Sequence, residues 1–135
     1  MLTRQKGDSS IEALRATVPG FAAAYATGEQ LGRWNIFYSE ESMLEALVRG
    51  SFSVGLTDLG TVTIERLPIK PLSIDGATPT LDNVATGRYR LTKTLGVVFR
   101  TSGFSPAADA FVRFLRSEEA RSILRSSGYL PVDGR

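Results

Sequence analysis

Four polar residues near the N-terminus could together bind a small anion: Arg4, Asp8, Ser9 and Ser10. The two serines directly precede Ile11, where apolar residues at helical spacing predict a helix. The first amides of a helix lack intrahelical acceptors and carry partial positive charge, so an oxyanion can dock there. The serine hydroxyls can donate to oxyanion oxygens, and Arg4 can add a charge-assisted pair. The same residues would equally suit an ordinary helix N-cap that binds no ligand.

Asp8 bears on which anion such a site would accept. A carboxylate repels a fully ionised oxyanion such as sulfate, molybdate or tungstate. It accepts a hydrogen bond from an anion that keeps a proton, as phosphate does near neutral pH. If Asp8 points inward, phosphate or a zwitterion is therefore favoured.

A second polar pair, Thr57 and Asp58, follows an apolar stretch that is predicted to be a short buried strand. Ligands in open α/β sheets bind at the carboxyl ends of strands, so both residues are candidate ligand contacts. The alternative is that Asp58 makes a local turn bond to its own backbone while Thr57 only ends the strand. The adjacent Glu40 and Glu41 would face apart on the first turn of a helix, where carboxylates suit the helix dipole rather than catalysis.

The composition of the 135 residues limits the chemistry further. The chain has no cysteine, which excludes disulfides, thiolate metal sites and a cysteine nucleophile. It has no histidine, which removes the usual zinc ligand and the usual general base near neutral pH. A carboxylate-based enzyme is a rival, but no spacing in the sequence brings two acidic groups together. We therefore expect a binding protein without catalytic residues, cofactor or metal.

The charge is unevenly distributed around a net charge of +2. Residues 1–87 carry a net charge of −3 and residues 88–135 carry +5. The arginines of the basic half are interspersed with acidic residues at helical spacing, as on a solvated face, and no nucleic-acid motif accompanies them, so we expect no nucleic-acid partner. No apolar run approaches the roughly 20 residues that span a bilayer, and the N-terminus lacks the apolar stretch of a signal peptide.

Predicted strands and helices alternate along the chain, which indicates an α/β fold. The predicted strands, including one edge or crossing segment, lie at residues 2–5, 34–38, 53–56, 67–74 and 91–99. The predicted helices lie at residues 9–18, 21–26, 40–48, 78–86, 106–116 and 118–127.

Local signals mark how several of these elements begin, end and pack. Ser9 and Glu12 have the spacing of a capping box, and Pro19-Gly20 should interrupt the first helical stretch. The segment 57–61 is predicted to be a loop. Four aromatic residues are expected in the core rather than at a ligand, namely Trp34, Phe37, Tyr38 and Phe52.

Residues 69–132 contain short motifs in a fixed order. They are Asp75-Gly76, Thr78-Pro79, Gly87-Arg88-Tyr89, Ser117-Glu118-Glu119 and Gly128-Tyr129-Leu130-Pro131. In order and spacing, these motifs resemble the C-terminal part of the phosphate-type substrate-binding proteins of ABC transporters. Arg4 followed by Asp8-Ser9-Ser10 resembles the Arg-x3-Ser-Gly-Thr of the same family, with Asp8 at the family's serine and Ser9 at its glycine. Residues 55–61 resemble the Thr-Asp-x-Gly-Thr loop of tungstate-binding relatives.

The resemblance implies a type II periplasmic-binding-protein fold, in which a mixed sheet is flanked by helices and two lobes close on a ligand. It covers the second half of the family pattern. This implies a second lobe at residues 1–100, which supplies half of the cleft, and C-terminal helices at residues 101–135, which return to the first lobe in the family. The implied ligand-binding residues are Arg4, Asp8, Ser9, Ser10, Thr57 and Asp58.

The function implied by the resemblance is to bind a small anion, phosphate or a related oxyanion, for an ABC-type importer. The permease of that transporter would be the partner, and the full-length parent would be periplasmic or extracellular. Two other functions stay open: an interaction or sensor module that has the same fold without ligand affinity, and a binder of amino acids or other zwitterions.

The C-terminal helices also bear on assembly. They carry apolar residues on faces that would pack on a first lobe: Phe111, Phe114, Leu115, Ile123 and Leu124. Such a face seldom stays in water, so we expect a homodimer through these helices rather than a compact monomer. Residues 101–105, which include Gly103, would be the hinge.

Overall fold

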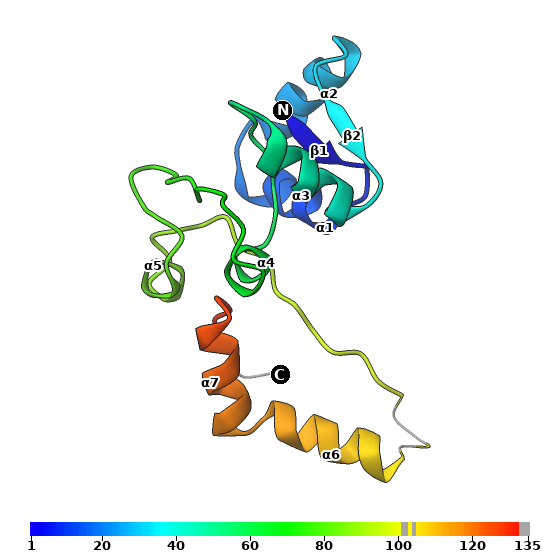
Figure 1. The fold of residues 1–135 in the computed structure, drawn as a ribbon, viewed down its shortest axis with the longest axis vertical. Coiled ribbons are helices and arrows are strands. Elements are labelled where there is room, and N and C mark those ends of the chain that lie inside the picture. Colours follow the sequence, from blue (N-terminus) through cyan, green and yellow to red (C-terminus); the bar gives the residue numbers. More distant parts are fainter. Residues whose placement is uncertain (101–102, 104, 133–135) are drawn as a thin grey trace.

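The computed structural model describes residues 1–100, 103 and 105–132. Its strands are β1 (Leu2–Arg4) and β2 (Asn35–Phe37). Its helices are α1 (Ser9–Thr17), α2 (Phe21–Gln30), α3 (Glu40–Arg49), α4 (Leu59–Ile64), α5 (Leu81–Ala85), α6 (Pro106–Leu115) and α7 (Glu118–Ser126). Figure 1 shows α1, α2 and α3 around the two strands, and α6 and α7 beyond a long extended segment. The predicted α/β class is confirmed in this coarse form, a helix-rich chain with a small parallel sheet.

The sheet consists of one parallel pair, in which Leu2 lies opposite Asn35 and Arg4 opposite Phe37. Helices α1 and α2 make the crossover between the two strands, as parallel pairing requires. The expected mixed sheet is not formed within the described residues, where this pair is the whole sheet. The predicted strand at 53–56 has no strand assignment either, although the Leu2 amide donates to the Val54 carbonyl oxygen at 2.8 Å.

Asp8, rather than Ser9, is the N-cap of α1. Its backbone is extended, and its carboxylate accepts a hydrogen bond from the Ser10 amide at 2.9 Å. The predicted capping box of Ser9 and Glu12 is therefore wrong by one residue, because the carboxylate of Asp8, one position earlier, already accepts the hydrogen bond from a free amide of the first turn. The predicted interruption is confirmed: α1 ends at Thr17, and Gly20 adopts a left-handed φ of 79° before α2.

The core lies between the sheet and the first three helices. Its buried apolar residues are Leu2, Ile11, Leu14, Tyr25, Met43 and Leu44. The Tyr25 ring stacks on Trp34 with ring centroids 5.5 Å apart, and the Trp34 indole donates to the Tyr25 carbonyl oxygen at 2.9 Å. This contact joins α2 to the chain just before β2.

Helix α3 begins after Ser39, as predicted. The hydroxyl of Ser39 accepts a hydrogen bond from the Ser42 amide.

Two of the four aromatic residues expected in the core are exposed. The side chains of Tyr38 and Phe52 face solvent, whereas Trp34 and Phe37 are half-buried. Phe52 lies in a turn after α3 with a left-handed φ of 62°, and Tyr38 directly follows β2. Neither residue lies in a helix or strand, where the regular spacing of side chains could direct it into the core. The prediction that both are core residues, which relied on their apolar neighbours in the sequence, is therefore wrong.

The segment between α3 and α6 contains less regular structure than predicted. Residues 91–99 form neither helix nor strand, and residues 67–74 contribute only an isolated bridge between Ile74 and Ala77. The predicted loop at 57–61 instead contains the start of α4, with Asp58 as its N-cap residue. Helix α5 begins after Thr80, whose hydroxyl accepts from the Asn83 amide, close to the predicted position.

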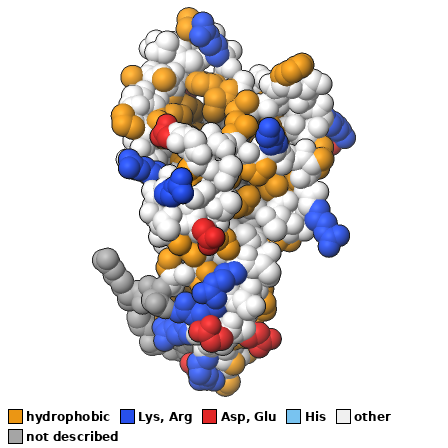
Figure 2. Space-filling view, turned by 90° about the vertical axis from the view of Figure 1, so that its left-hand side faces the viewer, with side chains coloured by type: hydrophobic (Ala, Val, Ile, Leu, Met, Phe, Trp, Pro, Cys, Tyr) orange, Lys and Arg blue, Asp and Glu red, His pale blue; other side chains and the backbone are white. Residues whose placement is uncertain are grey.

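Helices α6 and α7 begin at the predicted serine caps, because the hydroxyls of Ser105 and Ser117 accept hydrogen bonds from amides three residues on. Helix α6 has no buried residue, and its Phe111 and Phe114 side chains are exposed. Figure 2 shows Lys and Arg side chains interspersed with Asp and Glu at the end of the molecule that these helices form. No described helix is long and apolar enough to cross a membrane.

The C-terminal tail returns to α4 after α7. Gly60 is buried, and a Cβ atom there would overlap the ring of Tyr129. Gly128 has a left-handed φ of 83° and lies against the same helix. The contact therefore needs glycine on both sides. The predicted hinge at 101–105 and the division at residue 100 fall partly on Thr101, Ser102 and Phe104, outside the described residues.

Candidate ligand-binding site

A polar cavity of about 100 Å³ lies where β1 ends and α1 begins. Its lining comes from β1, α1, α3 and the segments before α4 and after α5. The lining residues are Arg4, Asp8, Ser9, Ser10, Glu40, Met43, Leu56 and Lys93. Four of the six residues predicted from the sequence to bind a ligand thus line one cavity. The other two, Thr57 and Asp58, contact its lining residues rather than the cavity itself.

Arg4 is fixed by two contacts at the end of β1. Its Nε lies 3.2 Å from Oδ2 of Asp8, and its Nη1 donates to the carbonyl oxygen of Phe37 at 3.3 Å. The side chains of Arg4 and Asp8 are only 16% and 18% exposed. Because its guanidinium has five N–H donors, Arg4 can hold these partners and still donate to a ligand.

Asp8 is shared between two neighbours. One carboxylate oxygen pairs with Arg4, and the other accepts from the Ser10 amide. The Ser10 amide, expected to donate to an anion, is therefore already satisfied by the protein, as the helix-cap alternative predicted. The hydroxyls of Ser9 and Ser10 still line the cavity.

Thr57 and Asp58 connect the cavity lining to α4. The Thr57 hydroxyl donates to Oε1 of Glu40 at 2.9 Å, which joins the chain before α4 to the start of α3. Asp58 makes no side-chain hydrogen bond to the first amides of α4 and instead pairs with Lys93, with Oδ1 and Nζ 3.2 Å apart. The local turn bond considered for Asp58 is thus not what the structure contains.

Two lining residues, Lys93 and Glu40, were missed by the sequence analysis. Lys93 lies in the predicted strand at 91–99 and has no local motif around it, yet its Nζ lies 3.3 Å from the Ser9 hydroxyl and 3.4 Å from the Ser10 hydroxyl. Glu40 was assigned to the first turn of a helix, where a carboxylate suits the helix dipole, and this assignment required no ligand. The cavity therefore brings together two cations, two carboxylates and two hydroxyls, with a third carboxylate, Asp58, behind Lys93.

The neighbouring Glu41 stays ionised more readily than an ordinary glutamate. A backbone hydrogen bond at the start of α3, then the Ser39 hydroxyl and the charge of Arg4, hold the pKa of the Glu41 carboxyl below its usual value. Glu41 is solvent-exposed and lines a second pocket, between α3 and α4. Its negative charge adds to the field on that side of the molecule.

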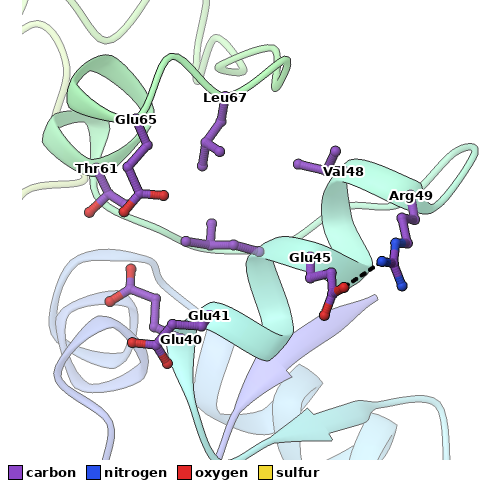
Figure 3. Close-up of a pocket in the computed structure, with 9 residues that line it drawn as sticks. Glu40, Glu41, Glu45, Val48, Arg49, Thr61, Glu65 and Leu67 are labelled. Atoms are coloured by element: carbon purple, nitrogen blue, oxygen red, sulfur yellow. Dashed lines mark ion pairs between the residues drawn. The ribbon is translucent and has the colours of Figure 1, made fainter.

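A larger pocket of about 380 Å³ lies between α3 and α4 (Figure 3). Four glutamates surround its apolar residues, and Arg49 pairs with one of them, Glu45. Its lining residues are Glu40, Glu41, Leu44, Glu45, Val48, Arg49, Thr61, Glu65 and Leu67. The excess of carboxylates in this pocket repels an oxyanion, so the smaller cavity is the better candidate for an anion site. No group of three or more acidic side chains in the described part of the chain is placed to hold a metal ion.

The polar cavity at a strand end and a helix N-terminus is the kind of site by which α/β binding proteins hold small polar ligands. The chain belongs to the bacterial extracellular solute-binding protein family, whose family model matches residues 4–130. The match begins at Arg4 and includes every predicted ligand-binding residue. It confirms the resemblance to solute-binding proteins that the sequence motifs indicated.

Two relatives show the same similarity. The phosphate-binding protein PstS 2 of Streptococcus agalactiae serotype V is 23% identical over 95 residues, which cover 70% of this chain and 31% of that protein. PstS 2 of Streptococcus pneumoniae serotype 4 is 26% identical over 92 residues, which cover 68% of this chain and 30% of that protein. The chain thus spans about a third of the length of the curated relatives it matches. No solved structure gives a significant match.

Proposed function

We propose that this chain is the anion-contacting lobe of a solute-binding protein that delivers phosphate, or a related oxyanion, to an ABC-type importer. The observation that carries the proposal is the convergence of Arg4, Lys93 and the two serine hydroxyls on one polar cavity. Membership of a solute-binding family and the similarity to phosphate-binding proteins support it. In this function the protein binds and releases its ligand and catalyses no reaction.

The acidic residues of the cavity favour phosphate over fully ionised oxyanions. Asp8 and Glu40 both line it, and each can accept a hydrogen bond from a protonated oxygen of phosphate. Sulfate, molybdate and tungstate carry no such proton near neutral pH and would meet only repulsion from these carboxylates. A zwitterionic ligand is the alternative, because its cationic group could pair with Glu40.

The remaining parts of the chain fit this proposal as follows. Residues 1–100 would be the second lobe of the family, which binds the ligand, and residues 101–135 would contribute the C-terminal helices that return to the first lobe, the other wall of the cleft. The full-length protein is periplasmic or extracellular, in accord with the description of its family, and presents its ligand to the permease of its transporter.

A titration of the full chain, labelled with ¹⁵N and followed by NMR, tests the proposed ligand. Phosphate should shift the amide resonances of Ser9 and Ser10 with a dissociation constant in the millimolar range, because one wall of a cleft supplies only about 4 kcal/mol of binding free energy. Sulfate, molybdate and tungstate should bind more weakly, and amino acids are the comparison for the zwitterion alternative. Submicromolar phosphate binding would contradict the half-cleft proposal, and equal binding of all oxyanions would contradict the role of the carboxylates.

One observation favours the rival function, a sensor or interaction module without ligand affinity. Both cations beside the cavity already have carboxylate partners, Arg4 with Asp8 and Lys93 with Asp58. A site that neutralises its own charges can be stable without a ligand. The same titration decides between the two functions, since the rival predicts no saturable shift with any oxyanion.

We also propose that the exposed apolar residues of α6 and α7 mediate self-association. Phe111, Phe114 and Ile123 are exposed in the single chain, and covering them removes apolar surface from water. Size-exclusion chromatography with light scattering across a dilution series should give the mass of a dimer at high concentration. A mass that stays near 14.6 kDa would exclude the dimer.

A further inference from the structure

Lys93 reaches the proposed anion site from a distant part of the chain. It lies in a segment without helix or strand between α5 and α6, and it is more than 80 positions from the serines that it contacts. Its Nζ has three neighbours within hydrogen-bond or ion-pair distance, which are the Ser9 hydroxyl, the Ser10 hydroxyl and Oδ1 of Asp58. The Lys93 side chain is 23% exposed, and its contact with Ser10 is partly buried, whereas its contact with Ser9 is exposed.

The donor and the acceptors in these hydrogen bonds are fixed by the chemistry of the groups. An ammonium group has three donors and no acceptor, so the three partners of Lys93 can only accept from it. When the oxygen of a serine hydroxyl accepts from Lys93, its own proton must point elsewhere. Within the described residues, neither the Ser9 nor the Ser10 hydroxyl donates to a protein acceptor. Both hydroxyls line the cavity, which is therefore an open direction for their protons.

We propose that Lys93 is a positioning residue of the anion site, which makes the hydroxyls of Ser9 and Ser10 donate into the cavity. This inference rests on the proposed function and adds how the site is tuned to an acceptor ligand. Asp58 balances the charge of Lys93, so the pair orients two donors while adding no net charge. Without the ammonium, the hydroxyls are free to turn toward the carboxylates of Asp8 or Asp58, and they no longer present two donors to an oxyanion.

A thermodynamic cycle on the full chain tests this role, with inorganic phosphate as the probe and amide chemical shifts as the readout. Lys93→Met should weaken phosphate binding about tenfold, the equivalent of one net hydrogen bond. Lys93→Arg keeps the donors and should bind within about threefold of the unmodified chain. Lys70→Met removes an equal charge from an exposed position and should leave the dissociation constant unchanged. Circular dichroism and thermal unfolding establish that each variant is folded.

Measuring Lys93→Met in a second background, which lacks the two serine hydroxyls, distinguishes a positioning role of Lys93 from a direct contact with the anion. In the chain that carries both Ser9→Ala and Ser10→Ala, Lys93→Met should have a clearly smaller effect, because the hydroxyls that Lys93 positions are gone and only its pairing with Asp58 remains. If Lys93→Met weakens binding by the same factor in both backgrounds, Lys93 acts through its own charge and the inference is wrong. An unchanged dissociation constant for Lys93→Met in the unmodified background overturns this inference alone. An unmodified chain that binds no phosphate overturns the proposed function, and this inference with it.

Discussion

Replacing Ile11 by alanine is expected to lower the free energy of unfolding by about 2–5 kcal/mol. Ile11 is 0% exposed and packs in the core formed by the sheet and the first three helices. Alanine loses the transfer free energy of three carbon atoms and leaves a cavity that the neighbouring side chains fill only in part. Because small domains are stable by only about 5–15 kcal/mol, the loss should be visible as a large decrease in the midpoint of urea unfolding.

Ile64→Ala is the matched control for this change. Ile64 lies at the end of α4 and is 60% exposed, so the same truncation should change the free energy of unfolding by no more than about 0.5 kcal/mol. Equal effects at the two positions would show that Ile11 is not part of a packed core. The test also bears on the ligand site, since Ile11 follows Ser9 and Ser10 on α1 and fixes the start of that helix.

Replacing Arg4 by glutamine should abolish detectable phosphate binding, with a loss of about ten- to a hundredfold in affinity. Hydrogen bonds that involve a charged group contribute about 1.5–3 kcal/mol, and this change removes the charge from one wall of the cavity. It also leaves the shielded carboxylate of Asp8 without its ionic partner, which increases repulsion of an anion. Phosphate titration by NMR at constant ionic strength measures the effect, because added salt screens such charges.

Two further variants show whether the effect belongs to Arg4 itself. Arg49→Gln breaks the exposed pair with Glu45 and should leave phosphate binding unchanged, because such surface pairs contribute little. Arg4→Lys keeps the charge but loses the planar fork and should bind with intermediate affinity. A wild-type dissociation constant for Arg4→Gln would exclude Arg4 from the anion site.

The elements that could be predicted from the sequence are those that local chemistry determines. Ser39, Ser105 and Ser117 each begin a helix because the hydroxyl and the amide that it accepts from lie within three residues. A strand needs a neighbour that no local pattern identifies. The β-branched and aromatic residues at 97–99 have high strand propensity, but they are exposed and unassigned to any sheet in the described structure.

The same distinction explains which parts of the site could be predicted. Asp8, Ser9 and Ser10 are adjacent, and their pattern before a helix indicated both an anion site and a helix cap, of which the cap is present. Lys93 reaches the cavity from a separate segment by a tertiary contact, which residue spacing does not encode. The pairing of Asp58 with Lys93 was missed for the same reason. The ligand-binding role of all these residues stays a prediction until an anion is titrated.

The contact between Tyr129 and Gly60 makes α4 a common neighbour of the C-terminal tail and the candidate site. The ring of Tyr129 rests on the first turn of α4, and Asp58, one residue before that helix, pairs with Lys93. A displacement of the tail that shifts α4 also moves the carboxylate that holds Lys93 beside the serines. If the cavity binds an anion, we expect its occupancy and the position of the C-terminal tail to be linked equilibria. If one tail position strengthens ligand binding, then ligand binding stabilises that tail position by the same free energy.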